Sequence, residues 1–262
     1  MTQSINVNNT TLAYRFDGPQ DAPVVMLSNS LMSNHTMWDP QIDALTARYR
    51  VLRYDTRGHG DSAVPSGPYT MTMLGEDAVA LIDGLGLDEV HFCGLSMGGM
   101  IGQYMGAHHA DRLLSLTLCD TACVMPPLSL WDDRITQARE FGLGSTVNAT
   151  LERWFTEPYR AAGNPEIDKV GVMIRGTDVE GFASCCAAIR DMDQTSALAS
   201  ITTPTLVVVG RFDPGTPVAA AEVLHENIAG SKLEVIEDAS HLCNIEQPAA
   251  FNAVLMDCLN RQ

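Results

Sequence analysis

The chain has 262 residues, enough for one large domain or two small ones, and its 45% hydrophobic and 18% charged residues are typical of a globular protein. Its 32 acidic and 16 basic residues give a net charge of −16, which opposes binding to nucleic acids and to anionic membrane surfaces. Residues 1–10 lack the basic start and apolar run of a signal peptide, and no apolar stretch approaches the roughly 20 residues that span a bilayer, so the sequence predicts a soluble protein.

Short apolar runs rich in β-branched residues alternate with helical patterns along most of the chain. Such alternation predicts an α/β fold, in which a mostly parallel sheet carries helices on both faces. The runs Val24–Leu27 and Leu206–Val209 show no polar alternation, as expected of strands buried on both sides. The predicted strands are Leu12–Phe16, Val24–Leu27, Val51–Tyr54, Val90–Cys93, Leu113–Cys119, Thr205–Val209 and Leu233–Ile236. The predicted helices include Met73–Leu85, Met97–His109, Val218–Ile228 and Ala249–Leu259.

A Gly-x-Ser-x-Gly pattern at residues 94–98 places Ser96 between a predicted strand and a predicted helix. This is the context of a nucleophile elbow, a turn so tight that the serine adopts strained dihedral angles and only small residues fit beside it. The turn lifts the hydroxyl clear of the sheet and places it at a helix N-terminus, where free N–H groups favour a developing negative charge. The alternative interpretation is a plain glycine turn.

The alternation stops between about Cys123 and Arg190, where aromatic residues stand among helix-like segments broken by glycine and proline. We predict a helical cap at 123–190, inserted into an α/β core of residues 1–122 and 191–262. The alternative is a separate second domain. The cap would lie over the C-terminal ends of the strands.

A serine nucleophile needs a base, and the chain offers seven histidines. His241 follows the predicted strand Leu233–Ile236, so it lies in a loop at the same edge of the sheet as Ser96. We therefore predict His241 as the base. His35 and His59 occupy other loops at this edge and remain alternatives.

The base in turn needs an acid that orients it. Asp213 ends a buried strand and is our first choice, although an aspartate before a proline is also a common turn residue. Asp120, which directly follows another predicted strand, is the alternative. Asp238 stands only three residues before His241 and is too local to be a comfortable partner.

An oxyanion hole needs two N–H groups that point at one position. The backbone of Met97, the residue after the nucleophile, is expected to supply one. The loop after strand Val24–Leu27 is expected to supply the other, from Leu31 with Ser30 beside it. Alternatively, the side chains of Asn29 and Ser30 only hold this loop together.

The seven cysteines are an odd number without a metal-type Cys-x-x-Cys pair, which predicts reduced thiols in the cytoplasm. Cys93 lies in the strand before the elbow, and Cys243 also lies near a chemical motif. At Cys93 a core thiol is expected rather than a reactive one.

These segments resemble the α/β-hydrolase superfamily across essentially the whole chain, and the order Ser96, Asp213, His241 is the order of that family. Within the superfamily the chain is similar to the 3-oxoadipate enol-lactonases of aromatic degradation, although esterases and cofactor-free haloperoxidases share much of the pattern. The segments that carry the resemblance are Leu27–Leu31, Met37–Gln41, Val51–Gly60, Phe92–Gly99, Arg153–Thr156 and Asp238–His241. Met32 departs from it, because a small residue is expected in the oxyanion loop.

The resemblance implies hydrolysis of 3-oxoadipate enol-lactone to 3-oxoadipate in the β-ketoadipate pathway, through an acyl-enzyme on Ser96. It implies no metal and no organic cofactor, and it makes Asp55 and Arg57 structural residues near the site. A general carboxylesterase and a ligand-binding protein without catalysis are the alternatives. The expected partner is a small lactone, with neither nucleic acid nor membrane; a homo-oligomer is compatible with the sequence but is not specified by it.

Such a substrate is an anion, so a chain of charge −16 must attract it locally, and arginine suits a carboxylate best. Arg134 follows Trp131 by three residues, so the two share a face of a helix. We predict that Arg134 and Trp131 face the substrate pocket and that Trp154 helps to close it. The other arginines of the cap, expected mostly as solvated charges, are Arg139, Arg153, Arg160, Arg175 and Arg190.

Overall fold

A computed structural model describes residues 1–261, and eight strands form one sheet at its centre. The strands are β1 (Gln3–Val7), β2 (Thr10–Asp17), β3 (Val24–Ser28), β4 (Arg50–Tyr54), β5 (Val90–Leu95), β6 (Leu113–Cys119), β7 (Thr205–Gly210) and β8 (Lys232–Ile236). Their order across the sheet is β1-β2-β4-β3-β5-β6-β7-β8. The pairs β1–β2 and β2–β4 are antiparallel and the other pairs are parallel. The predicted α/β fold with a mostly parallel sheet is confirmed.

All seven predicted strands are present, with ends that differ from the prediction by at most two residues. The eighth strand, β1, was not predicted. It lies at the edge of the sheet, where its residues are exposed or half-buried, so it lacks the continuous apolar run of a central strand. By contrast, every residue of β3, β5 and β7 is buried.

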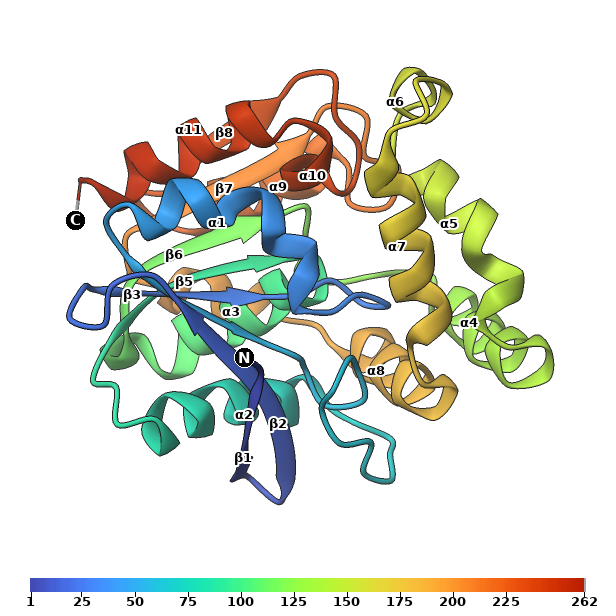
Figure 1. Cartoon of the computed structure of the whole chain (residues 1–262), viewed down its shortest axis with the longest axis horizontal. Coiled ribbons are helices and arrows are strands. Elements are labelled where there is room, and N and C mark those ends of the chain that lie inside the picture. The colour runs from blue at the N-terminus through green and yellow to red at the C-terminus, as the bar shows by residue number, and fades with distance from the viewer. Residues whose placement is uncertain (262) are drawn as a thin grey trace.

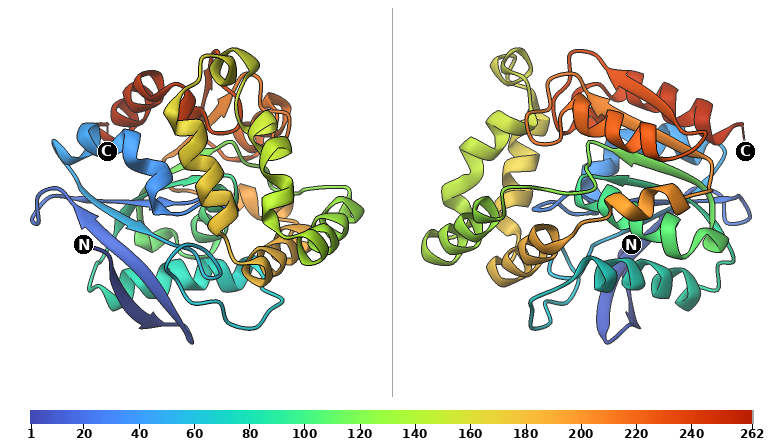
Figure 2. Two further views of the ribbon diagram at one scale, coloured as in Figure 1. Left: turned by 45° about the vertical axis from the view of Figure 1, so that its right-hand side comes forward. Right: turned by 180° about the vertical axis from the view of Figure 1, so that it is seen from behind.

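Helices cover both faces of the sheet. Helices α1 (Asp39–Thr46) and α11 (Pro248–Leu259) pack against each other on one face, while α2 (Met71–Gly84) packs against α3 (Met97–His108) on the other (Figure 1). Helix α9 (Val218–Asn227) packs on β7 and β8, on the same face as α3 (Figure 2). The sheet is therefore buried between two helical layers, which explains its apolar central strands.

Five α-helices lie between β6 and β7, in the segment for which the sequence predicts a cap. They are α4 (Leu128–Phe141), α5 (Val147–Trp154), α6 (Glu157–Ala161), α7 (Pro165–Gly176) and α8 (Val179–Asp191). In Figure 1 they stand together on the right, beyond the end of the sheet toward which the arrows of the parallel strands point. The two ends of the segment meet, because Val124 and Asp193 form an isolated bridge and Gln194 N donates to Cys123 O at 2.9 Å.

Within residues 1–261, the helices are all too short or too polar to pass through a lipid bilayer. All seven cysteines are free thiols; six are buried and Cys258 is half-buried. Cys93 lies in the interior of β5, as the sequence predicts for a core thiol.

Candidate active site

Ser96 joins β5 to α3 in a tight turn. Its φ of 58° and ψ of −115° lie outside the regions that a side chain readily adopts. Two hydrogen bonds of 2.8 Å hold the turn, from Ser96 N to Cys119 O and from Thr121 Oγ1 to Ser96 O. A Cβ atom at Gly98 would lie 2.1 Å from the carbonyl oxygen of Ser28, so only glycine lets α3 approach β3 so closely. The strained serine thus stands at the N-terminus of α3.

A pocket opens at Ser96. Its lining comes both from the loops at the C-terminal edge of the sheet and from the cap segment. The predicted site residues that line it are Ser30, Leu31, Ser96, Trp131, Arg134, Trp154, Asp213 and His241. Met97 is the first residue of α3, directly after Ser96.

His241 and Asp213 lie on the loops that follow β8 and β7, and they are joined by a hydrogen bond of 2.7 Å between Nδ1 and Oδ2. The carboxylate is held from three other directions. Its Oδ1 accepts from the backbone N–H of Gly215 at 2.8 Å and of Thr216 at 3.1 Å, and its Oδ2 accepts from Thr216 Oγ1 at 2.6 Å. Since Nδ1 is engaged with Asp213, Nε2 is the ring nitrogen that remains for the pocket.

Burial and pairing set the charges of these two groups. Burial alone would raise the pKa of Asp213, but the charge of His241 and the hydrogen bonds of His241 and Thr216 outweigh it and lower this pKa to about 2. Burial alone would lower the pKa of His241, but the negative charge and hydrogen bond of Asp213 outweigh it, so this pKa lies above the ordinary 6.5. His241 is therefore a base above that pKa, held by a carboxylate that stays ionised.

The two alternative histidines are engaged elsewhere. His35 Nδ1 contacts Asp55 Oδ1 at 3.1 Å. His59 Nε2 accepts from the backbone N–H of Met32 at 3.0 Å, and burial lowers the pKa of His59 to about 4, so its ring is neutral. The structure thus brings His241, and neither of these histidines, into contact with Asp213.

Asp120, the alternative acid, is completely buried but does not bond to His241. Its Oδ1 accepts from Gly210 N at 2.8 Å, and its Oδ2 accepts from Cys243 Sγ at 2.8 Å. Burial, reinforced by the negative charge of Asp213, raises the pKa of Asp120 well above its ordinary value. Asp238 is exposed on the loop before His241.

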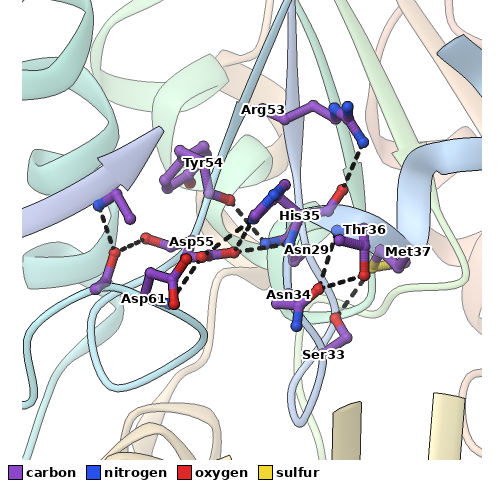
Figure 3. A network of polar contacts seen from close by, with 12 residues as sticks. Asn29, Ser33, Asn34, His35, Thr36, Met37, Arg53, Tyr54, Asp55 and Asp61 are labelled. Carbon is purple, nitrogen blue, oxygen red and sulfur yellow. Dashed lines mark hydrogen bonds and ion pairs between the residues drawn. The ribbon is translucent and has the colours of Figure 1, made fainter. Parts of the chain in front are cut away.

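The loop after β3, which carries Ser30 and Leu31, is held by the side chain of Asn29. Asn29 Nδ2 donates to Tyr54 O at 2.7 Å, and its Oδ1 accepts from Trp38 Nε1 at 3.0 Å. Asn29 therefore holds the loop together, the alternative role named for it above. Figure 3 shows Asn29 beside Tyr54 among the contacts of this loop. Met32 has a φ of 61°, a left-handed conformation that explains why a small residue is expected there.

Asp55 joins neighbouring backbone segments beside the loop. It is fully buried, and its carboxylate accepts from His35 N at 2.7 Å and from Asp61 N at 2.9 Å (Figure 3). Arg57 is also buried and pairs with the carboxylate of Asp77. Both residues make structural contacts beside the pocket and neither lines it.

The three cap residues chosen from the sequence all reach the pocket. The guanidinium of Arg134 lies over the ring of Trp131, 4.7 Å from its centroid, as their spacing on one helix predicts. Trp131 is itself fixed, because its Nε1 donates to Met125 O at 2.8 Å. The Trp154 ring lies 6.0 Å from the ring of His241, at an angle of 31°.

Two further residues at the site were not identified from the sequence. Arg153 also lines the pocket, whereas the sequence analysis groups it with surface arginines such as Arg139, which pairs with Glu180; its place in the segment Arg153–Thr156 was the available signal. Glu246 is buried beneath the loop of His241. Glu246 could not be predicted as a site residue because it belongs to no sequence motif.

Glu246 ties the His241 loop to the cap. Its Oε2 accepts from Ser240 N at 2.8 Å, and its Oε1 accepts from Thr156 N at 3.0 Å. The same segments are joined by Leu242 N, which donates to Trp154 O at 3.1 Å. The position of the histidine is therefore coupled to the end of α5, which carries Arg153 and Trp154.

Comparison with known proteins shows the family of this chain. The model of the alpha/beta hydrolase family matches residues 24–254. The chain is 39% identical over 259 residues to 3-oxoadipate enol-lactonase 2 of Acinetobacter baylyi, covering 98% of this chain and 96% of that protein. Enol-lactonase 1 of the same organism is 38% identical over 246 residues, with coverage of 94% and 92%.

Among solved structures, the enol-lactonase from Burkholderia xenovorans LB400 is similar, with a TM-score of 0.96 and 40% sequence identity. The match covers 98% of this chain and 100% of that one. The chain is thus similar in sequence to all three proteins, and similar in fold to the Burkholderia enzyme, over nearly its whole length. It belongs to the alpha/beta hydrolase family of enzymes.

Proposed function

We propose that this protein hydrolyses 3-oxoadipate enol-lactone to 3-oxoadipate, a reaction of the β-ketoadipate pathway. The observation that carries the proposal is the composition of one pocket. A strained serine and a His241–Asp213 pair line the same space as two arginines, Arg134 and Arg153, so groups for acyl transfer lie beside groups that suit a carboxylate. The similarity to two enol-lactonases of Acinetobacter baylyi supports this choice of substrate.

In the first half-reaction, Ser96 Oγ attacks the lactone carbonyl carbon while His241 Nε2 takes its proton. The negative charge that develops on the carbonyl oxygen is stabilised by the backbone N–H groups of Met97 and Leu31. The ring C–O bond then breaks. The leaving group is an enolate, whose carbon takes the proton from His241 Nε2 as it becomes the ketone, so His241 is neutral again while the acyl group stays on Ser96.

In the second half-reaction, water gives a proton to His241 and attacks the acyl carbon. The same N–H groups stabilise the second oxyanion, and the bond to Ser96 Oγ breaks as the serine regains its proton. Asp213 stays ionised and holds the ring of His241 so that Nε2 faces the reacting atoms. Protein groups and water supply each step, so the proposed reaction requires no metal and no organic cofactor.

The direct test is the loss of ultraviolet absorbance when the enol-lactone is mixed with the pure protein. We expect kcat/KM for the lactone to exceed kcat/KM for a neutral ester such as p-nitrophenyl acetate. Rapid hydrolysis of the neutral ester with slow hydrolysis of the lactone would instead indicate a general carboxylesterase. Binding of the lactone without turnover would indicate a ligand-binding protein.

Replacement of Arg134 by alanine is expected to lower kcat/KM for the lactone by about 10- to 150-fold, because a charge-assisted hydrogen bond contributes about 1.5–3 kcal/mol. The neutral ester carries no carboxylate, so its kcat/KM should change little. The same substitution at Arg139, whose partner Glu180 lies at the surface, is the matched control and should affect neither substrate. Equal losses on both substrates for Arg134→Ala would show that this arginine supports the fold instead.

The reaction should fail in acid. Because Asp213 raises the pKa of His241 above 6.5, the neutral base is lost as the pH falls through that raised value. We expect kcat/KM for p-nitrophenyl acetate, measured from about pH 5 to about pH 9, to fall in acid with the slope of a single proton and a midpoint above 6.5. An acid limb centred well below 6.5 would contradict the pairing of His241 with an ionised carboxylate.

A further inference from the structure

The turn after β3 leaves one backbone N–H group without an acceptor. Leu31 N forms no hydrogen bond within residues 1–261, although Leu31 is buried and lines the pocket together with Ser96. The N–H groups around it are all engaged: Ser30 N with Met37 Sδ at 3.3 Å, Met32 N with His59 Nε2 at 3.0 Å, and Ser33 N with Ser30 O at 3.3 Å. A buried N–H group without a partner is rare in a folded protein. Leu31 N is therefore the donor that this turn keeps for a ligand.

The turn has a backbone conformation that its sequence does not favour. The bond from Ser33 N to Ser30 O closes four residues, and the third of them, Met32, has a φ of 61°. Glycine is the usual residue where the third position of such a turn has a positive φ, because a Cβ atom is strained there. With methionine in this place, the peptide between Leu31 and Met32 would be less strained in the opposite orientation, as in a type I turn. A contact outside the turn must therefore hold it.

His59 makes that contact. Its Nε2 accepts the N–H of the same peptide, Met32 N, at 3.0 Å. In the opposite orientation the peptide would turn its carbonyl oxygen toward this nitrogen, and two acceptors would face each other. The hydrogen bond therefore selects the strained orientation. His59 is only 2% exposed and is not among the residues that line the pocket, so it acts on the turn and not on a ligand.

The ring of His59 is held in the one protonation state that can accept this bond. Its other nitrogen, Nδ1, lies 3.4 Å from Arg57 O, an acceptor, so Nδ1 carries the proton and Nε2 is free to accept. Burial lowers the pKa of His59 to about 4, against the bond to Arg57 and the charges of Asp55 and Asp178, which raise it. The acceptor is therefore uncharged at neutral pH. A carboxylate in its place would put a negative charge beside a turn that must stabilise an oxyanion.

The turn that carries His59 is itself fixed by both parts of the fold. On the core side, Gly58 N donates to Ala63 O and His59 N donates to Thr56 O, each at 2.9 Å. On the cap side, Gly58 packs against Gly181 of α8 so closely that a Cβ atom at Gly58 would lie 2.7 Å from Gly181 Cα. His59 is thus a rigid support, and not a side chain that is free to follow the turn after β3.

We propose that His59 is a positioning residue for the oxyanion hole: it holds the turn Ser30–Ser33 so that Leu31 N faces the carbonyl oxygen of the substrate. The inference rests on the proposed function only in that Ser96 attacks a carbonyl group, and it is the same for a lactone and for a simple ester. Without the bond to Met32 N, the turn should relax to its less strained form. A displacement of about 1 Å can cost on the order of 10²-fold in rate, so the effect should be large.

The experiment compares two amides at position 59 in the hydrolysis of p-nitrophenyl acetate. The oxygen of glutamine can lie where Nε2 lies in histidine, whereas the shorter asparagine reaches only as far as Nδ1. We expect His59→Asn to lower kcat by about 10- to 100-fold and His59→Gln to retain most of it. KM should change little, because both half-reactions pass through an oxyanion and slow together. His91→Asn is the matched control: His91 is also buried, but it bonds to Ser115 within the sheet, so its loss should leave kcat unchanged.

A second pair of variants tests the reason for the effect. Glycine adopts a φ of 61° without strain, so Met32→Gly should make the turn less dependent on its support. In the Met32→Gly background we expect His59→Asn to lower kcat by less than about threefold. An undiminished loss in this background would show that His59 does not act through the strain at Met32, and it would overturn the inference.

A measurement on the wild type keeps the inference testable if His59→Asn does not fold. Nitrogen-15 NMR of the histidine rings should show, at about pH 7, a neutral His59 ring with its proton on Nδ1, assigned by the signal that His59→Gln removes. A proton on Nε2 would overturn the inference, since that nitrogen could then not accept from Met32 N.

Equal kcat of His59→Asn and the wild type, or equal losses in His59→Asn and His59→Gln, would also overturn it. These outcomes are separate from the fate of the proposed function. If the lactone is turned over and His59→Asn behaves like His91→Asn, only the positioning role fails. If the ester responds as described but the lactone is not hydrolysed, the positioning role stands and the proposed substrate is wrong.

Discussion

Replacement of Ser96 by alanine is expected to lower kcat for the enol-lactone by about 10⁶-fold, the loss typical of a serine hydrolase without its nucleophile. No other side chain in the turn can form the acyl-enzyme. The activity that remains would come from the oxyanion hole and from substrate binding. The measurement is the rate of loss of lactone absorbance under saturating substrate, with pure variant protein.

This variant should fold normally. Serine and alanine both carry a Cβ atom, so the strain of the 58° φ is the same in both proteins. The hydrogen bonds that hold the turn use the backbone of Ser96 and are kept. Circular dichroism and thermal unfolding should match the wild type. A folded Ser96→Ala protein with near-normal activity would rule out the serine mechanism.

Replacement of Asp213 by asparagine is expected to lower kcat by roughly 10⁴-fold. The oxygen of the new amide would keep accepting from the N–H groups of Gly215 and Thr216. Its NH₂ group would then face His241 Nδ1, which must become the acceptor, so the ring proton moves to Nε2. In this tautomer His241 cannot take the proton of Ser96.

The matched control is Asp120→Asn, at the other aspartate that follows a parallel strand of the sheet. Asp120 bonds to Gly210 and Cys243 and not to His241, so an amide of the same shape keeps its contact with Gly210 N. We expect at most about a tenfold loss of kcat, because Asp213 still holds the ring of His241. If Asp120→Asn cripples the enzyme and Asp213→Asn is mild, Asp120 is the acid.

The central strands could be predicted because they are buried on both faces. A run such as Val24–Leu27 contains no polar residue, so its pattern alone excludes an exposed element. The edge strand β1 could not be predicted in this way. Its residues are partly exposed, and it exists because β2 offers it a hydrogen-bonding edge, which is a property of another segment.

The choice of the catalytic acid and base also depends on segments that are distant in the sequence. Asp120 and Asp213 both follow parallel strands, and His35, His59 and His241 all lie in loops at one edge of the sheet. The sequence ranked these residues by position but left alternatives. The pairing of β7 with β8 brings the loop of Asp213 beside the loop of His241, so that these two side chains meet at 2.7 Å.

The sequence by itself determined what depends on neighbours along the chain: the α/β alternation, the elbow with its obligatory small residues around Ser96, and the shared helical face of Trp131 and Arg134. Each of these follows from backbone sterics or from helical spacing within a few residues. Only the tertiary structure decided the features that arise where distant segments of the chain come into contact. It placed Arg153 in the pocket and Glu246 between the cap and the histidine loop. Whether an arginine or a glutamate is solvated or enclosed depends on what folds over it, and that information is not local to its own stretch of sequence.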